Sequence, residues 1–500
     1  MDIKEIIEGC GAVSAEGSLD KEIVSITADS RQAGAGAMFI AVKGFASDGH
    51  SYIPAAVGKG ASAIVYDDEA ALGAAFAAAG TERDASRDGV TYIKVEASRH
   101  ALAVIASNFY GRPSEKLTLV GITGTNGKTT TVTLLYNLFR DLGYECGLLS
   151  TIANYVGTRS SEAVNTTSDP ITINSLLAEM VRTGCSYCFM EVSSIGIEQE
   201  RVAGLKFKAG IFSNLTHDHL DYHKTFAEYL RCKKLFFDNL PADAVAITNV
   251  DDRNGLVMVQ NTKAKVVTYS CRTMADHTCR IIEESFDGMQ LNIDGKECWT
   301  NLIGQHNAYN ILAIYSTAVS LGAGPEEALI GISRLKSARG RLETLRGPRD
   351  ISVVIDYAHT PDALENVLKT LREIAPEREL VCLFGCGGDR DRTKRPEMAA
   401  VAQKLADRII VTSDNSRTER TEDIMEDIKA GMDIRGKARS LFIADRKEAI
   451  RTAIMTAQQG ATILLAGKGH ETYQIIGKEK RHFDEKEIVE EIFREAAAAE

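Results

Sequence analysis

The sequence predicts an α/β protein of three domains, and three observations support this. The chain has 500 residues, more than a single core of about 100–200 residues would use. Apolar, β-branched runs alternate with longer helical segments, which is typical of parallel sheets covered by helices. Turn-rich stretches at "NFYGRPSEK" and "SRLKSARGRLETLRGPRD" interrupt this alternation. We therefore expect domains at residues 1–112, 113–336 and 337–500.

Each expected domain has its own pattern of strands. In the first, the strands "AMFIAVKG" and "ASAIVYDD" are separated by Ala/Gly-rich helices. The second repeats strand, loop and helix, with a small β element expected at "GMQLNIDGKECWT". In the third, "SVVIDY", "LVCLFG", "RIIVTSD" and "TILLAGKG" alternate with helices, which predicts a Rossmann-like, doubly wound parallel sheet.

Composition restricts the class of protein. The 44% hydrophobic and 25% charged content is that of a soluble globular enzyme, and no run approaches the roughly 18 apolar residues of a membrane span. The start "MDIKEIIEGC" does not resemble an export signal, so we expect a cytoplasmic protein. With 58 basic and 69 acidic residues, the net charge of −11 argues against nucleic-acid and membrane partners.

Ten cysteines without framework spacing fit a reducing compartment. Cys185 and Cys188 have redox spacing, but they run into an apolar strand, so we expect simple burial.

The stretch "LTLVGITGTNGKTTTVTLLYNLFRDL" predicts a phosphate-binding loop between a strand and a helix. Gly124 and Gly127 let the backbone N–H groups turn toward a phosphate at the helix N-terminus. Lys128 adds a charge near the terminal phosphates, and the Thr129 hydroxyl can ligate Mg²⁺. The usual pattern would have glycine in place of Ile122, which leaves open a structural turn with a solvated lysine.

The string "GTNGKTT" is the form that this loop takes in the Mur ligase family, the ATP-dependent ligases that add amino acids to UDP-N-acetylmuramoyl peptides in cell-wall synthesis. The first domain resembles that family's uridine-nucleotide domain over "DSRQAGAGAMFIAVKGFASDGHSYIPAAVGKGASAIV". Ten further strings follow in the family's order: "NTTSDP", "MEVSSIGIEQERV", "NLTHDHLDYH", "YLRCKKLFF", "GQHNAYN", "GRLE", "DYAHTPDAL", "FGCGGDRDRTKRP", "TSDNSR" and "GKGHETYQ".

This resemblance implies an N-terminal α/β uridine-nucleotide domain, a central P-loop-type α/β ATPase domain and a C-terminal Rossmann-like domain that binds the amino acid. It implies ATP and Mg²⁺ as co-substrate and cofactor, small-molecule substrates and a monomer. Positions matching the family's nucleotide contacts are Gly124, Thr125, Asn126, Gly127, Lys128, Thr129, Thr130, Asn307, Asn310, Arg341 and Asp356. For the last four, helix capping or surface polarity is the alternative.

Lys128, Glu191, His219 and Lys233 match the family's catalytic positions, and Thr129, Glu191, His219 and Lys233 its metal positions. Glu191 ends an apolar strand, where a carboxylate can hold Mg²⁺ or be solvated. Lys233 lies four residues after Tyr229, the spacing at which the family carries an N-carboxylated lysine; the carbamate would turn a cation into a metal-binding anion. Lys234 is the alternative register.

The positions matching the uridine-nucleotide substrate are Ser30, Asn165, Thr166, Thr167, Ser193, Gln199 and Arg201. Those matching the amino-acid pocket are Arg390, Asp414, Asn415, Ser416, Arg417, Gly467 and Glu471. Arg417 could pair with the second carboxylate that meso-diaminopimelate has and L-lysine lacks. Two departures stand out: Ser416 replaces a proline, which we expect to loosen the turn before Arg417, and Ile195 replaces a histidine.

The sequence thus predicts an ATP-dependent ligase that adds a third residue, meso-diaminopimelate, to UDP-N-acetylmuramoyl-L-alanyl-D-glutamate through an acyl phosphate. The alternatives are the same ligase using L-lysine, a folylpolyglutamate-type ligase, a nucleotide switch or motor that is not a ligase, and a non-catalytic scaffold.

Overall fold

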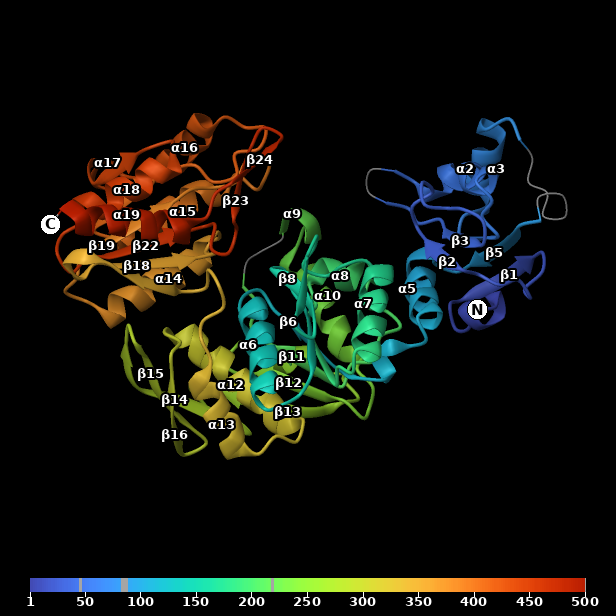
Figure 1. The fold of residues 1–500 in the computed structure, drawn as a ribbon, viewed down its shortest axis with the longest axis horizontal. Helices are drawn as coiled ribbons and strands as arrows, with labels where there is room; N and C mark the ends of the chain where they lie inside the picture. The colour runs from blue at the N-terminus through green and yellow to red at the C-terminus, as the bar shows by residue number, and fades with distance from the viewer. Residues whose placement is uncertain (45–46, 82–88, 217–219, 500) are drawn as a thin grey trace.

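The computed structural model describes residues 1–44, 47–81, 89–216 and 220–499. Three main sheets follow one another along the chain, at the blue, green and red parts of the ribbon in Figure 1.

The first sheet has five strands in the order β1-β5-β4-β3-β2. All neighbours are parallel except β1 and β5. The strands are β1 (Ala12–Glu16), β2 (Ser25–Thr27), β3 (Ala37–Ile40), β4 (Ala63–Tyr66) and β5 (Thr91–Val95), and the helices are α1 (Ile3–Ile6), α2 (Ile53–Gly58), α3 (Glu69–Ala78) and α5 (Ser98–Phe109), with 3₁₀ turns at Gly49–Tyr52 and Pro113–Glu115. Every residue of β3 and β4 is buried, as expected for a parallel sheet covered on both faces.

The second sheet has eleven strands in the order β16-β15-β14-β13-β12-β11-β6-β10-β7-β8-β9. Its strands are β6 (Thr118–Thr123), β7 (Cys146–Leu149), β8 (Ala153–Val156), β9 (Arg159–Glu162), β10 (Tyr187–Glu191), β11 (Ala209–Phe212), β12 (Val245–Asn249), β13 (Lys265–Ser270), β14 (His277–Ser285), β15 (Gly288–Ile293) and β16 (Lys296–Thr300). The middle of the sheet is parallel and the two edges are antiparallel. The β element expected at "GMQLNIDGKECWT" is confirmed as the β15–β16 hairpin.

Helices cover both faces of the second sheet. They are α6 (Lys128–Asp141), α7 (Pro170–Arg182), α8 (Ser194–Glu198), α9 (Leu220–His223), α10 (Phe226–Asp238), α11 (Gly255–Met258), α12 (Gln305–Ser320) and α13 (Pro325–Arg334). Alternate strand residues face opposite cores: Val120 and Ile122 pack with α6, α12 and α13, whereas Leu119 packs with α7 and α10. Cys185 and Cys188 lie in the second of these cores as buried free thiols, as predicted, and burial raises the pKa of Cys188 well above its usual value.

The third sheet has the order β17-β18-β22-β19-β20-β21, parallel except for β17. Its strands are β17 (Glu343–Arg346), β18 (Ser352–Asp356), β19 (Leu380–Phe384), β20 (Arg408–Val411), β21 (Ser440–Phe442) and β22 (Thr462–Ala466), with a separate hairpin of β23 (Tyr473–Ile476) and β24 (Glu479–His482). The helices are α14 (Pro361–Ile374), α15 (Lys394–Leu405), α16 (Thr421–Ala430), α17 (Ile434–Ala438), α18 (Arg446–Thr456) and α19 (Glu485–Ala499), with a 3₁₀ turn at Pro348–Asp350.

The core residues of the third sheet divide between α14, α15 and α16 on one face and α18 and α19 on the other. The predicted doubly wound parallel sheet is therefore confirmed, and with it the three-part α/β fold. The residue boundaries 1–112, 113–336 and 337–500 stay a prediction. In the described part of the chain, no helix is both long and apolar enough to cross a membrane.

Candidate active site

The loop after β6 closes around two glycines. At Gly124, φ is +154° and a Cβ would lie 2.0 Å from Ser213 Oγ; at Gly127, φ is +87° and a Cβ would lie 2.4 Å from Asn310 Oδ1. A side chain at either position would displace a neighbour and strain the backbone. The loop ends at the N-terminus of α6, where backbone N–H groups and the helix dipole favour an anion.

Two lysine side chains, from different helices, meet on one carbonyl of this loop. Lys128 Nζ donates to Gly124 O at 2.9 Å and to Thr125 O at 2.8 Å. Lys233 Nζ, on α10, donates to the same Gly124 oxygen at 2.8 Å, and its side chain is 1% exposed. Lys234, the alternative register, instead pairs with Asp238 at 2.5 Å. The geometry therefore favours Lys233 as the lysine that meets the loop.

Hard oxygen donors flank the same loop. Glu191 ends β10, one strand from β6, and its buried carboxylate accepts the N–H of Thr151 at 2.8 Å. Thr129 and Thr130 lie buried in the first turn of α6. Carboxylate and hydroxyl oxygens are the ligand type that Mg²⁺ prefers. His219, the remaining predicted ligand, lies outside the described residues.

Asn307 and Asn310 lie near the start of α12 and face this loop. Asn310 Nδ2 donates to Asn307 Oδ1 at 3.0 Å, and Thr131 Oγ1, from α6, lies 3.5 Å from Asn310 Oδ1. Both asparagines are buried, so they are not surface polar groups. They lie against the nucleotide loop, where Asn310 is next to Gly127.

The C-terminal part contributes Arg341 and Asp356. The Asp356 carboxylate ends β18 and accepts N–H groups from Leu342 and Ala358, both at 2.8 Å. Burial raises its pKa, although the Arg341 guanidinium and these hydrogen bonds oppose the shift. The guanidinium lies 4.8 Å from the ring centre of Tyr357. Its Nε is buried and lacks a hydrogen-bond partner among the described residues, so it can donate to a bound nucleotide.

Sequence reasoning missed the contact that joins the C-terminal part to the nucleotide loop. Asp362, in the first turn of α14, accepts a hydrogen bond from Asn126 Nδ2 at 3.0 Å and another from Thr216 Oγ1 at 3.2 Å. Burial raises the pKa of Asp362. The string "DYAHTPDAL" contains this residue, but only the fold shows that it reaches Asn126, 236 positions earlier.

Four of the residues predicted to bind the uridine-nucleotide substrate form one hydrogen-bonded group. Ser193 N donates to Thr167 Oγ1 at 3.0 Å, and Arg201 donates to Thr167 O and to Gln199 Oε1, both at 2.6 Å. Gln199 Nε2 in turn donates to Tyr222 OH at 3.2 Å. The arginine is therefore held by carbonyl oxygens and presents its charge beside α8.

Three other predicted substrate residues lie at the margin of this group or away from it. Thr166 Oγ1 accepts from Thr151 Oγ1 at 3.1 Å, which places it near Glu191. Asn165 is exposed. Ser30 lies in the first sheet's part of the chain, where its carbonyl accepts Lys59 Nζ at 3.0 Å.

The predicted amino-acid pocket is built around an unpredicted lysine. Lys468 is fully buried, and its Nζ donates to Glu471 Oε2 at 3.0 Å and to Asn415 Oδ1 at 3.2 Å. It also lies 3.8 Å from Asp414 Oδ1. Burial opposes ionisation of Asp414, but the charges of Lys468 and Arg446 outweigh it and lower its pKa.

Gly467 lets the chain pass close to the carboxylate of Asp414. Its φ is +115°, and a Cβ there would lie 2.7 Å from Asp414 Oδ2. Asn415 Nδ2 donates to Glu471 Oε2 at 2.9 Å, so Asn415 and Glu471 are also held in place. Lys468 lies inside the string "GKGHETYQ", between two predicted residues, but a lysine is not expected to be fully buried.

The turn before Arg417 is held firmly without proline. Ser416 Oγ lies 2.6 Å from Thr421 Oγ1 and is buried. Arg417 has φ +51°, and its backbone bonds to the β23–β24 hairpin through Ile475 O and Gly477 N. Its NH1 donates to Gly388 O at 2.8 Å. The expected loosening of this turn is therefore not what the structure shows. Arg390, the other predicted arginine, is exposed.

A buried ion pair holds the backbone next to two residues of the pocket. Arg446, on α18, donates Nε to Glu485 Oε1 at 2.8 Å, NH1 to Ser413 O at 3.0 Å and NH2 to Ala466 O at 2.8 Å. Both charged side chains are fully buried. Arg446 thus fixes the carbonyls directly before Asp414 and Gly467, and no sequence pattern pointed to it.

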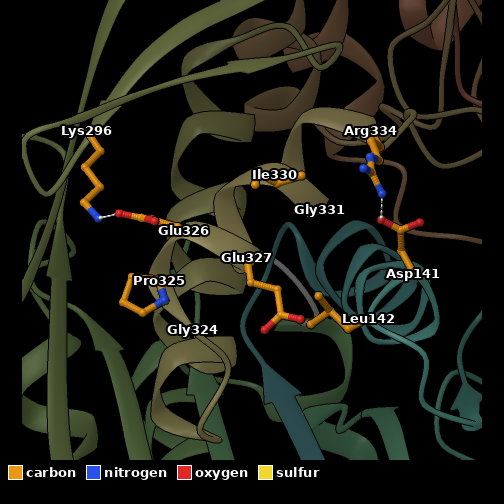
Figure 2. Close-up of a pocket in the computed structure, with 10 residues that line it drawn as sticks. All are labelled: Asp141, Leu142, Lys296, Gly324, Pro325, Glu326, Glu327, Ile330, Gly331 and Arg334. Atoms are coloured by element: carbon orange, nitrogen blue, oxygen red, sulfur yellow. Dashed lines mark hydrogen bonds and ion pairs between the residues drawn. The ribbon is translucent and has the colours of Figure 1, made fainter.

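A cavity of about 690 Å³ lies elsewhere, at the far end of α6 from Lys128. Figure 2 shows its wall on α13 and the two ion pairs at its edge, Arg334–Asp141 at 3.1 Å and Lys296–Glu326 at 2.9 Å. It contains none of the predicted site residues.

Comparison with known proteins agrees with this geometry. Three family models match: "Mur ligase family, catalytic domain" over residues 22–110, "Mur ligase middle domain" over 122–318 and "Mur ligase, glutamate ligase domain" over 340–469. A protein of Bacteroides fragilis named UDP-N-acetylmuramoyl-L-alanyl-D-glutamate–2,6-diaminopimelate ligase is 49% identical and covers 99% of both chains. The chain belongs to the Mur ligase family. It is accordingly an ATP-dependent ligase that forms amide bonds.

Other relatives of this Mur ligase carry the same name. One from Clostridioides difficile is 40% identical over 98% of the chain and 99% of the relative. A solved structure of such a ligase has a TM-score of 0.70 at 29% identity and covers 99% of both chains. A folylpolyglutamate synthase of Mycobacterium tuberculosis complexed with ADP has a TM-score of 0.58 at 18% identity, with 72% of this chain and 91% of that one covered; it shares the fold.

Proposed function

We propose that this Mur ligase adds meso-diaminopimelate to UDP-N-acetylmuramoyl-L-alanyl-D-glutamate. The observation that carries the proposal is the set of fixed charges in the pocket: Arg417 lies on a restrained turn, and the carboxylates of Asp414 and Glu471 are held by Lys468. An amino acid with two carboxylates and two ammonium groups matches such a pocket. Relatives 48–49% identical over nearly the whole chain are named for this reaction.

The reaction must first activate a carboxylate. The γ-phosphoryl group of ATP passes to the D-glutamate carboxylate: a P–O bond forms to that oxygen and the bond to the β-phosphate breaks, releasing ADP. The free amine of the amino acid then attacks the acyl carbon. The tetrahedral adduct loses inorganic phosphate and the amine loses a proton, which leaves an amide. Lys128 and the N–H groups at the start of α6 would offset charge on the transferring phosphoryl group.

The donor set beside the loop fits Mg²⁺. Thr129 and Glu191, with His219 as predicted and Lys233 as a carbamate, would hold it. The positive charge of the ion would offset the negative charge of the phosphate oxygens.

Carboxylation of Lys233 also has an electrostatic reason. Two ammonium groups, Lys128 and Lys233, donate to the same carbonyl of Gly124. Because like charges this close repel, conversion of the buried amine to a carbamate would replace repulsion of Lys128 with attraction. It would also add an oxygen ligand beside the loop.

The substrate carboxylate would reach this loop from the group around Arg201. Thr167 Oγ1 donates to the carbonyl of Glu191 at 2.9 Å, so the substrate group and the candidate metal ligand are directly linked. Arg201 suits a pyrophosphate or a peptide carboxylate. Closure of the C-terminal part through Asp362 would bring the amino acid to the acyl phosphate. The cytoplasmic location and monomeric state stay predictions.

Release of phosphate from ATP tests this function. We expect release to require UDP-N-acetylmuramoyl-L-alanyl-D-glutamate and to rise further when meso-diaminopimelate is added. ATP hydrolysis that ignores both compounds would indicate a nucleotide switch. Phosphate release that depends on a folate and glutamate would indicate a folylpolyglutamate-type ligase, and stimulation by L-lysine alone would indicate the lysine-adding branch.

A further inference from the structure

A second set of metal-ligand side chains comes from α8, α9 and α10. Glu198 ends α8, His223 ends α9 and Cys232 lies in the middle of α10. Each offers one ligand atom, and the three atoms lie within 4.8 Å of one another. None of the three belongs to the proposed nucleotide, substrate or amino-acid contacts.

The chemistry of this set suits Zn²⁺ better than Mg²⁺. Thiolate sulfur and imidazole nitrogen bind Zn²⁺ at about 2.3 and 2.0 Å, and a carboxylate oxygen binds at about 2.1 Å. In a tetrahedral site, two such ligands stand about 3.5 Å apart, so a contraction of about 1 Å would complete it. Glu198 is exposed and ends its short helix, which lets it supply that movement.

The two other ligands are already positioned. His223 and Cys232 are 5% and 1% exposed. The His223 ring packs against the rings of Tyr222 and Tyr229, with centroids 4.9 and 5.2 Å away, and its Nε2 lies 2.9 Å from Ser194 Oγ. A hydrogen bond of this kind fixes the orientation of a ligating imidazole.

The neighbouring lysine does not occupy this position. Lys233 follows Cys232 in the chain, but its Nζ donates to Gly124 O, on the nucleotide loop. The ammonium group is therefore directed toward the phosphate site, while the Cys232 thiol lies with Glu198 and His223.

We propose that Glu198, His223 and Cys232 bind one Zn²⁺ ion, with water as the fourth ligand. The ion would join the end of α8, which precedes Gln199 and Arg201, to α10, which carries Lys233. It would therefore tie the substrate group to the helix of the candidate carbamate. The proposal rests on this geometry and holds whichever amino acid the ligase uses.

Cobalt substitution tests the site. The full-length protein is stripped with a chelator, given excess Mg²⁺ to fill oxygen sites, and titrated with Co²⁺. We expect one equivalent to bind with a thiolate-to-cobalt charge-transfer band in the near ultraviolet, and Zn²⁺ to displace it. Cys232→Ser should abolish the band, whereas Cys185→Ser, which removes a buried thiol outside the cluster, should retain it.

Glu198→Gln changes an exposed side chain and leaves the fold intact, so it keeps the test informative if Cys232→Ser misfolds. It should weaken Co²⁺ binding by at least tenfold, as should His223→Gln. The proposal fails if wild-type protein gives no charge-transfer band, if the band persists in Cys232→Ser, or if Glu198→Gln and His223→Gln both bind Co²⁺ as tightly as wild type.

Discussion

Replacing Lys468 with methionine would remove the only buried cation that touches both acidic residues of the amino-acid pocket in the described structure. Its Nζ lies 3.0 Å from Glu471 and 3.8 Å from Asp414. Lys468→Met keeps most of the side-chain volume, so the effect is that of the charge. Breaking a buried ion pair typically costs about 3–5 kcal/mol because the partner charge is left uncompensated.

Part of this free energy is recovered when one of the two carboxyl groups takes up a proton. A protonated carboxyl group no longer attracts an ammonium group of the amino acid, and loss of such a charge-assisted pair costs about 2–5 kcal/mol. We therefore expect at least about 2 kcal/mol to be lost from binding of the amino acid, which is a rise of about 30-fold in its KM. The KM for ATP should stay within about twofold of wild type, because Lys468 makes no described contact with the nucleotide loop.

The assay is phosphate release at varied amino acid and at varied ATP. Lys447→Met is the matched control, since Lys447 forms an exposed pair with Glu491 at 2.8 Å in the same part of the chain, and such pairs contribute at most about 1 kcal/mol. A KM for the amino acid within about threefold of wild type in Lys468→Met would refute the reasoning. An equal rise in the KM for ATP would show that the substitution damages the whole C-terminal part instead.

Three further outcomes are expected. Lys128→Ala should reduce ligation by more than tenfold, about 1.4 kcal/mol. Its melting temperature should stay unchanged, because the lysine bonds to carbonyl oxygens of the loop. Activity above a tenth of wild type would contradict its role. Lys233→Ala should lose activity and regain part of it with short carboxylic acids, whereas Lys234→Ala should stay active; carbon-13 NMR with labelled bicarbonate should show the carbamate in wild type. The hydrogen bonds from Arg395 lower the pKa of Glu419 from 4.5 to about 2. The ionised Glu419 therefore stabilises the fold above about pH 4.5, and this stabilisation is lost as the pH falls toward 2. Over this pH range the urea midpoint should fall more steeply in wild type than in Glu419→Gln.

The strands and the nucleotide loop could be predicted because their signals are local. Runs such as "LTLVGIT" and "TILLAGKG" became buried parallel strands, and the glycines of "GTNGK" have the positive φ values that the turn requires. Family strings also named the residues that meet near residues 414–417. These predictions needed no knowledge of which strands become neighbours.

Residues that act across elements could not be predicted in this way. Arg446 supports the pocket because β20 and β22 both end beside α18, and its partner Glu485 lies 39 positions further on. Asp362 meets Asn126 only when the second and third sheets are packed together. Such pairs depend on the tertiary arrangement and leave no periodic signal in the chain.

Serine in place of proline at position 416 is another feature whose effect the local sequence does not predict. Loss of proline predicted a looser turn from backbone freedom alone. The hydroxyl contact with Thr421 and the backbone bonds of Arg417 to the β23–β24 hairpin supply the restraint instead, and these come from elements that the local string does not contain.

The central claim is tested most directly by a competition between two amino acids. The protein is given ATP, UDP-N-acetylmuramoyl-L-alanyl-D-glutamate and equimolar meso-diaminopimelate and L-lysine, and the two products are quantified by mass spectrometry. A charge-assisted pair lost in a closed site costs about 2–5 kcal/mol; because Arg417 is only half-buried, we expect about 2–3 kcal/mol, a preference of about 30- to 150-fold for diaminopimelate. Arg417→Ala should bring the ratio close to one. Equal or greater lysine product in wild type, or an unchanged ratio in Arg417→Ala, would contradict the account.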